Sequence, residues 1–199
     1  MGLCGLLSPL LGFTFILCSI SISPWFSWTH NALSDLGVGG SSQLFNLGLI
    51  LSGVLLFLCA LGLYNIDPGG VIPSLGWALL ASSGLSLIGV GVFPENKGNI
   101  HLYFSVAFFA LLASSLLVVG FGLISYRRCG LAAFTFSLGA TASLVWLMPY
   151  EGAAIPEAIS SVLGSVWIVA VSVLYLKGSS LYQAPHRLSK DFKAFRKII

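Results

Sequence analysis

Six residues between the hydrophobic stretches of this chain, or at the very start of one, carry side chains that can move protons, bind metals or attack acyl groups. Three are carboxylates, two are histidines and one is a serine: Asp35, Glu95, Glu157, His30, His101 and Ser34. A histidine oriented by a carboxylate is a general acid–base pair, and a serine beside such a histidine is a nucleophile. Histidine and carboxylate side chains are also ligands for zinc and other divalent ions. We therefore treat these six residues as one candidate polar site.

The spacing of these residues matches no specific motif. There is no G-x-S-x-G sequence around Ser34, and the histidines stand singly, so a divalent metal is only a candidate cofactor. Haem ligation by His30 and His101 is a weaker alternative, because no C-x-x-C-H attachment sequence is present. Acid–base chemistry, with His101 as the base and Asp35 or Glu95 orienting it, needs no further group.

Each of these residues also has an ordinary structural interpretation, which stays open from the sequence alone. Asp35 can cap a turn, and Glu157 suits the first turn of a helix, where an acid offsets the helix dipole. Glu95 can cap or solvate a loop, and His101 can hydrogen-bond a loop carbonyl. Two residues are more typical of solvated loops: His30 and Glu151.

Composition indicates the elements that must position these side chains. The chain has 199 residues, 57% of them hydrophobic and 8% charged, whereas soluble domains contain roughly 25% charged residues. A membrane-spanning helix needs about 20 apolar residues. The sequence predicts an all-α polytopic membrane protein, a bundle of six transmembrane helices over Leu3–Ile22, Gln43–Tyr64, Val71–Phe93, Ile100–Tyr126, Leu131–Met148 and Glu157–Leu176.

The distribution of lysine and arginine predicts the orientation of the bundle, because short cytoplasmic loops are enriched in both residues. With both termini in the cytoplasm, eight of the nine lysines and arginines lie inside and only Lys97 lies outside. We therefore expect a cell-membrane protein with cytoplasmic termini. In that orientation all six candidate residues emerge on the outer side, and we expect Asp35, Glu95, His101 and Glu157 to share one outward pocket.

The chain changes character after residue 177, so we divide it into a six-helix domain (1–177) and a cytoplasmic tail (178–199). In the tail, apolar residues recur at intervals of four, three and four, and basic residues fill the gaps. This pattern predicts a short amphipathic helix that lies on anionic lipid or docks a protein partner. Its basic residues are Arg187, Lys190, Lys193, Arg196 and Lys197.

Small residues four apart recur in the predicted helices, at Gly48 and Ser52, for example, and at Ser160 and Gly164. Such pairs allow helix backbones to approach closely. They favour packing within the bundle, with an interface between copies of the chain as the alternative.

Four short motifs carry a family resemblance. They are S-D-L-G (Ser34–Gly37), F-N-x-G-L-x-x-S-G (Phe45–Gly53), G-x-F-P-E (Gly91–Glu95) followed by His101, and I-P-E (Ile155–Glu157). In this combination the chain resembles the six-span family named domain of unknown function 998, which is similar to the wider Frag/DRAM/Sfk-like group. The resemblance implies the six-helix fold and an outward polar cluster of Asp35, Glu95, His101 and Glu157. It implies no reaction, ligand or partner.

Three function classes follow from these observations. The leading hypothesis is a non-catalytic accessory subunit or organiser of a larger membrane complex, because no catalytic motif and no soluble domain are evident. The alternative is a small intramembrane hydrolase or transferase acting on a lipid or lipid-linked substrate at the outer leaflet. A transporter is third, since the spans contain almost no charge. The expected partners are membrane lipids and other membrane protein subunits, and nothing in the sequence indicates nucleic-acid binding.

Overall fold

The computed structural model describes residues 1–67 and 69–182, so the basic tail residues named above lie outside the described residues. Within them, six long helices occur and no strand does. All six are long and apolar enough to cross a membrane. The predicted six-helix membrane bundle is therefore confirmed, with helices α1 (Gly2–Ser21), α2 (Ser42–Ile66), α3 (Val71–Val92), α4 (Asn99–Ser125), α5 (Cys129–Leu144) and α6 (Ala154–Leu176).

The helix boundaries agree with the predicted spans to within three residues at most positions. Helix α6 begins at Ala154 rather than Glu157, which places Pro156 inside its first turn. Proline is well tolerated there, because the first N–H groups of a helix have no partner within the helix. At α5, the regular helix stops at Leu144, and a short 3-10 helix, η3 (Val145–Leu147), completes the span.

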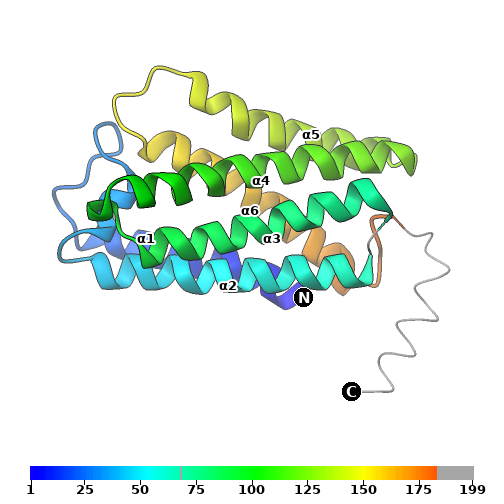
Figure 1. The fold of residues 1–199 in the computed structure, drawn as a ribbon, viewed down its shortest axis with the longest axis horizontal. Helices are drawn as coiled ribbons and strands as arrows, with labels where there is room; N and C mark the ends of the chain where they lie inside the picture. Colours follow the sequence, from blue (N-terminus) through cyan, green and yellow to red (C-terminus); the bar gives the residue numbers. More distant parts are fainter. Residues whose placement is uncertain (68, 183–199) are drawn as a thin grey trace.

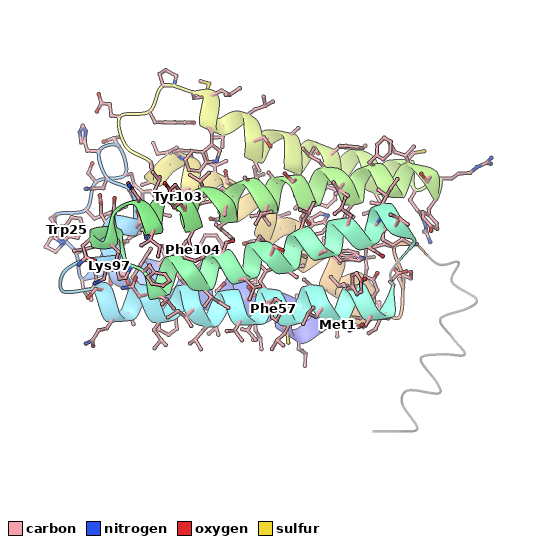
Figure 2. All side chains as sticks on the ribbon, in the orientation of Figure 1. Met1, Trp25, Phe57, Lys97, Tyr103 and Phe104 are labelled. Atoms are coloured by element: carbon pink, nitrogen blue, oxygen red, sulfur yellow. The ribbon has the colours of Figure 1, made fainter. Side chains whose placement is uncertain are left out.

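The helices run alternately up and down, which separates two ends of the bundle (Figure 1). One end carries the loops between α1 and α2, α3 and α4, and α5 and α6; we call it the pocket end. The other carries the N-terminus, the end of α6 and the two remaining turns; we call it the terminal end. Trp25, Lys97 and Tyr103 lie together at the pocket end (Figure 2).

Small residues hold the helices together within the bundle. On α2, Gly48 leaves room for Phe15, since a Cβ at this position would lie 2.3 Å from the Cβ of Phe15. Ser52 donates a 2.9 Å hydrogen bond to the carbonyl of Ser8 on α1. Gly53 and Gly84 bring α2 and α3 into backbone contact, because a Cβ on either would lie 3.0 Å or less from the other's carbonyl oxygen. At these positions the small residues serve packing between neighbouring helices.

The core is aromatic near the terminal end. Trp77 and Trp167 are fully buried, with ring centroids 6.0 Å apart, and Tyr182 packs edge-on to Trp77 at 6.2 Å. Residues 178–182, which we assigned to the tail, thus include part of the bundle: Leu181 and Tyr182 belong to the same buried cluster. The chain folds back over the end of the bundle immediately after α6.

Candidate functional site

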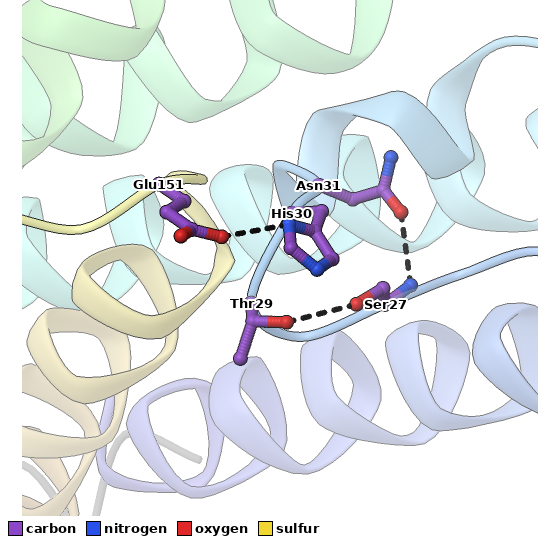
Figure 3. Close-up of polar contacts among 5 residues, drawn as sticks. All are labelled: Ser27, Thr29, His30, Asn31 and Glu151. Carbon is purple, nitrogen blue, oxygen red and sulfur yellow. Dashed lines mark hydrogen bonds and ion pairs between the residues drawn. The ribbon is translucent and has the colours of Figure 1, made fainter.

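Two loops at the pocket end are joined through Asn31. The backbone N–H of Ala154 donates a 2.9 Å hydrogen bond to the carbonyl of Asn31, and Gly152 packs against the same peptide. The Asn31 side chain accepts from the N–H of Ser27 at 2.9 Å (Figure 3) and donates to Oδ2 of Asp35 at 2.8 Å. These contacts hold the 3-10 helix η1 (Leu33–Gly37) against the start of α6.

A pocket of about 540 Å³ lies between η1, α4, α5 and α6. Its polar part includes Ser34, Glu95, His101 and Glu157. Its apolar part follows α4 and the end of α5, and consists mainly of Leu102, Val106, Phe109, Ala110, Ala113, Ala142 and Trp146. The size falls in the range of sites for small organic ligands, roughly 300–1,000 Å³. Four of the six candidate residues therefore line one cavity.

His101 is buried at the start of α4, with 6% of its surface exposed. Its Nδ1 lies 2.8 Å from the carbonyl oxygen of Phe93, the residue that follows α3. A carbonyl oxygen can only accept a hydrogen bond, so in the neutral imidazole Nδ1 carries the proton and Nε2 presents its lone pair. That Nε2 is buried and has no hydrogen-bond partner. One nitrogen of His101 therefore bonds a loop carbonyl, and the other is a basic nitrogen without a partner.

Asp35 and Glu95 form a pair of interacting carboxyl groups beside this histidine. Oδ2 of Asp35 accepts from the N–H of Ala32 at 3.0 Å, so Asp35 does cap a turn. Burial raises the pKa of the Glu95 carboxyl above its ordinary value, and a hydrogen bond and the negative charge of Asp35 raise it further. Ser34 and His101 act on Glu95 in the opposite sense. Asp35 itself is not among the residues that line the pocket, and it acts there only through its interaction with Glu95.

Glu157 is the third carboxyl group of this end. It lies in the first turn of α6, but only 6% of its surface is exposed, and its Oε2 accepts a 2.6 Å hydrogen bond from the N–H of Leu33. The residue therefore ties α6 to η1, in addition to any interaction with the helix dipole. It lies close enough to Glu95 and Asp35 for their charges to interact.

His30 lies apart from the other candidates. Its Nδ1 is 2.9 Å from Oε2 of Glu151, and both side chains are largely exposed, at 69% and 74% (Figure 3). Neither residue lines the pocket. This pair bridges two loops at the surface, as the solvated interpretation of both residues implied.

A metal site and a serine nucleophile, both considered from the sequence, lack the geometry that they need in the described part of the chain. Within residues 1–67 and 69–182, no group of three or more histidine, cysteine, aspartate or glutamate side chains is placed to hold a metal ion. Ser34 is buried and contacts Glu95, but no hydrogen bond to His101 is found among the described contacts. A serine nucleophile activated by His101 therefore has no support.

Sequence reasoning missed one polar cluster, at the terminal end. Asp67 is fully buried, and its Oδ2 accepts hydrogen bonds from the hydroxyls of Tyr175 and Ser180, from the N–H of Leu181 at 2.9 Å and from that of Tyr182 at 3.3 Å. Tyr175, near the end of α6, is buried as well, with 2% of its surface exposed. The only signal in the sequence was an acid in a glycine-rich turn with no lysine or arginine beside it.

Comparisons with known proteins identify a family for this chain. The family model described as "Protein of unknown function (DUF998)" matches residues 6–174. No curated protein and no solved structure matches the chain. The match covers most of the chain and includes all four motifs, while the wider Frag/DRAM/Sfk-like group remains a resemblance. This six-helix membrane protein belongs to the DUF998 family of proteins of unknown function.

Proposed function

We propose that this protein is a small intramembrane enzyme, a hydrolase or transferase, that acts on a lipid or lipid-linked substrate bound in the pocket. The observation that carries the proposal is the free Nε2 of His101. A buried basic nitrogen without a partner is costly to maintain unless a ligand or substrate satisfies it. Here it lies in a ligand-sized cavity lined by two carboxyl groups.

The arrangement supplies a base and an acid. Nε2 of His101 can take a proton from a water molecule or a substrate hydroxyl, whose oxygen then bonds to the reacting carbon of the substrate. The bond from that carbon to the leaving group breaks, and the leaving group needs a proton. Glu95, whose pKa is raised, is the carboxyl group suited to supply it. Phe93 fixes the imidazole through its carbonyl, so the base stays oriented.

The orientation of the bundle in the membrane is part of the proposal. Eight of the nine lysines and arginines favour a cytoplasmic terminal end, which would place the pocket in the outer leaflet. Lys97→Cys and Lys177→Cys, each in a chain otherwise free of cysteine, test this with an impermeant thiol reagent on intact cells. Labelling at 97 and protection at 177 are expected, and the reverse would contradict the orientation.

The activity is tested with the purified protein in nanodiscs made from the native membrane's lipid extract. We expect mass spectrometry to show a lipid species that disappears with time and a product that appears. His101→Ala should abolish this conversion, and His30→Ala is the matched control, since His30 is an exposed histidine at the same end. Conversion that survives His101→Ala, or no conversion by the wild-type protein, would overturn the proposal.

The accessory-subunit hypothesis stays a prediction. Its sequence arguments were the lack of a catalytic motif and of a soluble domain, together with a basic tail suited to docking, and that tail lies outside the described residues. Copurification of the native protein in a gentle detergent tests it: a stoichiometric protein partner would support that hypothesis.

A further inference from the structure

We infer that the pocket binds a single-chain amphiphile whose head group is an ammonium, and that Glu95 and His101 receive this group. The inference rests on the proposed function for the identity of the site, but it concerns binding and does not require turnover. Three separate features of the pocket carry it: its shape, its charge and its unpartnered atoms.

The shape suits one hydrocarbon chain below a polar group. Along α4, His101, Ser105, Phe109 and Ala113 form one row of residues four apart, and Leu102, Val106, Ala110 and Ser114 form the adjacent row. At 1.5 Å per residue, His101 to Ser114 covers about 20 Å of helix, a large part of a hydrocarbon core of about 30 Å. Leu102 and Val106 are more than half exposed, so the apolar wall faces the lipid.

The end of α5 and the following η3 form the opposite wall of this groove. The indole of Trp146 packs on the ring of Phe109, with centroids 4.9 Å apart, and its Nε1 donates a 3.0 Å hydrogen bond to Ser160 on α6. In Figure 1, α5 diverges from α4 toward the pocket end. A chain entering sideways from the membrane therefore finds an apolar groove that leads to the polar residues.

The charge of the pocket excludes an anionic head group. Glu95 and Glu157 line it, Asp35 interacts with Glu95, and none of the lysines and arginines in residues 1–67 and 69–182 lines it. The nearest basic residue in the sequence is Lys97, which is exposed in the short 3-10 helix η2 (Glu95–Lys97). A phosphate placed here would face carboxyl groups with no cation to balance it, whereas an ammonium would relieve their mutual repulsion.

The unpartnered atoms require a hydrogen-bond donor. Among the described residues, two buried atoms of the pocket have no partner, Nε2 of His101 and Oε2 of Glu95, and both are acceptors when the imidazole is neutral and the carboxyl is ionised. In the empty pocket the raised pKa of Glu95 favours its protonated form, and a bound ammonium favours the ionised form. An ammonium has donors and no acceptor, so it satisfies such a pair without leaving an unpaired acceptor of its own. A hydroxyl head group can donate only one hydrogen.

Four probes test the inference on the full chain in nanodiscs of zwitterionic lipid: dodecylamine, dodecanol, dodecyl phosphate and ethanolamine. Binding is measured as the rise in unfolding temperature with probe concentration. We expect dodecylamine to bind about tenfold or more tightly than dodecanol, as a charge-assisted hydrogen bond would give. Dodecyl phosphate and the chain-free ethanolamine should bind least.

Variants test which residues produce the preference for dodecylamine over dodecanol. Glu95→Gln and His101→Gln should each lower the preference for dodecylamine by about tenfold, and Val106→Trp, which fills the groove, should weaken dodecylamine and dodecanol alike. Glu151→Gln is the matched control, because Glu151 is an exposed carboxylate at the same end. Equal binding of dodecylamine and dodecanol, tighter binding of dodecyl phosphate, or an equal loss in Glu151→Gln would overturn the inference.

These outcomes are separable from a failure of the proposed function. Selective dodecylamine binding in a protein that converts no lipid would contradict the enzyme and leave the ammonium site standing. Conversion of a neutral lipid that depends on His101, without a preference for the amine, would contradict the ammonium site and leave the enzyme standing.

Discussion

The two ends of the bundle each bury a carboxyl group, and they use it in opposite ways. At the terminal end, Oδ2 of Asp67 receives four hydrogen bonds, two of them from hydroxyls on residues more than 100 positions away. At the pocket end, Glu95 and His101 keep an acceptor atom without a partner beside a cavity of about 540 Å³. Burial by itself therefore does not mark a binding site; unmet hydrogen-bonding capacity beside open space does.

The carboxyl group of Asp67 has a structural role. The contacts of Asp67 come from Tyr175 at the end of α6 and from the segment 180–182, so they fasten the last described residues across the base of the bundle. Trp77 adds a 3.0 Å hydrogen bond from its indole to the carbonyl of Asp67. Oδ1 of Asp67 has no hydrogen-bond partner among the described residues, but it lies at this packed end, and Asp67 does not line the pocket at the other end.

The largest expected effect is therefore at Asp67. Asp67→Ala leaves several buried donors without an acceptor, and each costs about 1–3 kcal/mol, so we expect a loss of about 3 kcal/mol or more. Thermal unfolding in nanodiscs measures it. Asp67→Asn keeps an acceptor oxygen and the shape, so its loss should be clearly smaller. An Asp67→Ala protein as stable as wild type would remove the distinction between the two ends.

Glu157 should give the next largest effect, because it both accepts a structural hydrogen bond and lines the pocket. Glu157→Ala orphans the N–H of Leu33, and we expect a loss of about 1–3 kcal/mol in the same measurement. Glu157→Gln retains an acceptor for that N–H and should lose less than half as much. If both variants destabilise equally, the charge of Glu157 matters more than its hydrogen bond.

Glu95 should make stability depend on pH. Since folding raises the pKa of Glu95, the folded protein holds the proton at pH values where the unfolded chain has released it. The stability contributed by this carboxyl is fully present below its ordinary pKa of 4.5 and falls as pH rises through the folded value. Glu95→Gln should flatten this slope in unfolding curves recorded from about pH 4 to about pH 8. An unchanged slope would place the dependence elsewhere.

The smallest effect is expected at the exposed His30–Glu151 pair. Exposed ion pairs contribute little, because water screens them, so His30→Ala should change stability by less than about 0.5 kcal/mol. It should also leave the ammonium preference of the pocket intact. A change as large as that of Glu157→Ala would mean that the loop contact, and not the buried network, holds the pocket end together.

Much of the fold could be predicted, because spanning helices are local. The six hydrophobic stretches predicted α1 to α6, and proline, glycine and charged residues predicted the breaks between them. The end of α5 was harder, since η3 is as apolar as the helix it follows. The small residues Gly48 and Ser52 indicated close packing, but only the structure identifies α1 as their partner.

The sequence predicted which residues form the candidate site, but not which of them contact one another. His101 and Glu95 follow the same helix, so their closeness in space is partly local. The hydrogen bond from Leu33 to Glu157 joins residues 124 positions apart, and no periodicity in the sequence indicates it. The separation of His30 from His101 was equally invisible, since both lie in pocket-end segments of similar composition.

The amino-acid sequence determined the number of helices, their lengths and which loops share an end of the bundle, because hydrophobicity and chain breaks act over neighbouring residues. Only the tertiary structure decided which polar groups are satisfied and which are not. A carboxylate such as Asp67 finds its donors, and His101 keeps a free nitrogen, through the order in which the helices pack around one another. That order depends on side-chain contacts between distant segments, which composition and spacing do not record.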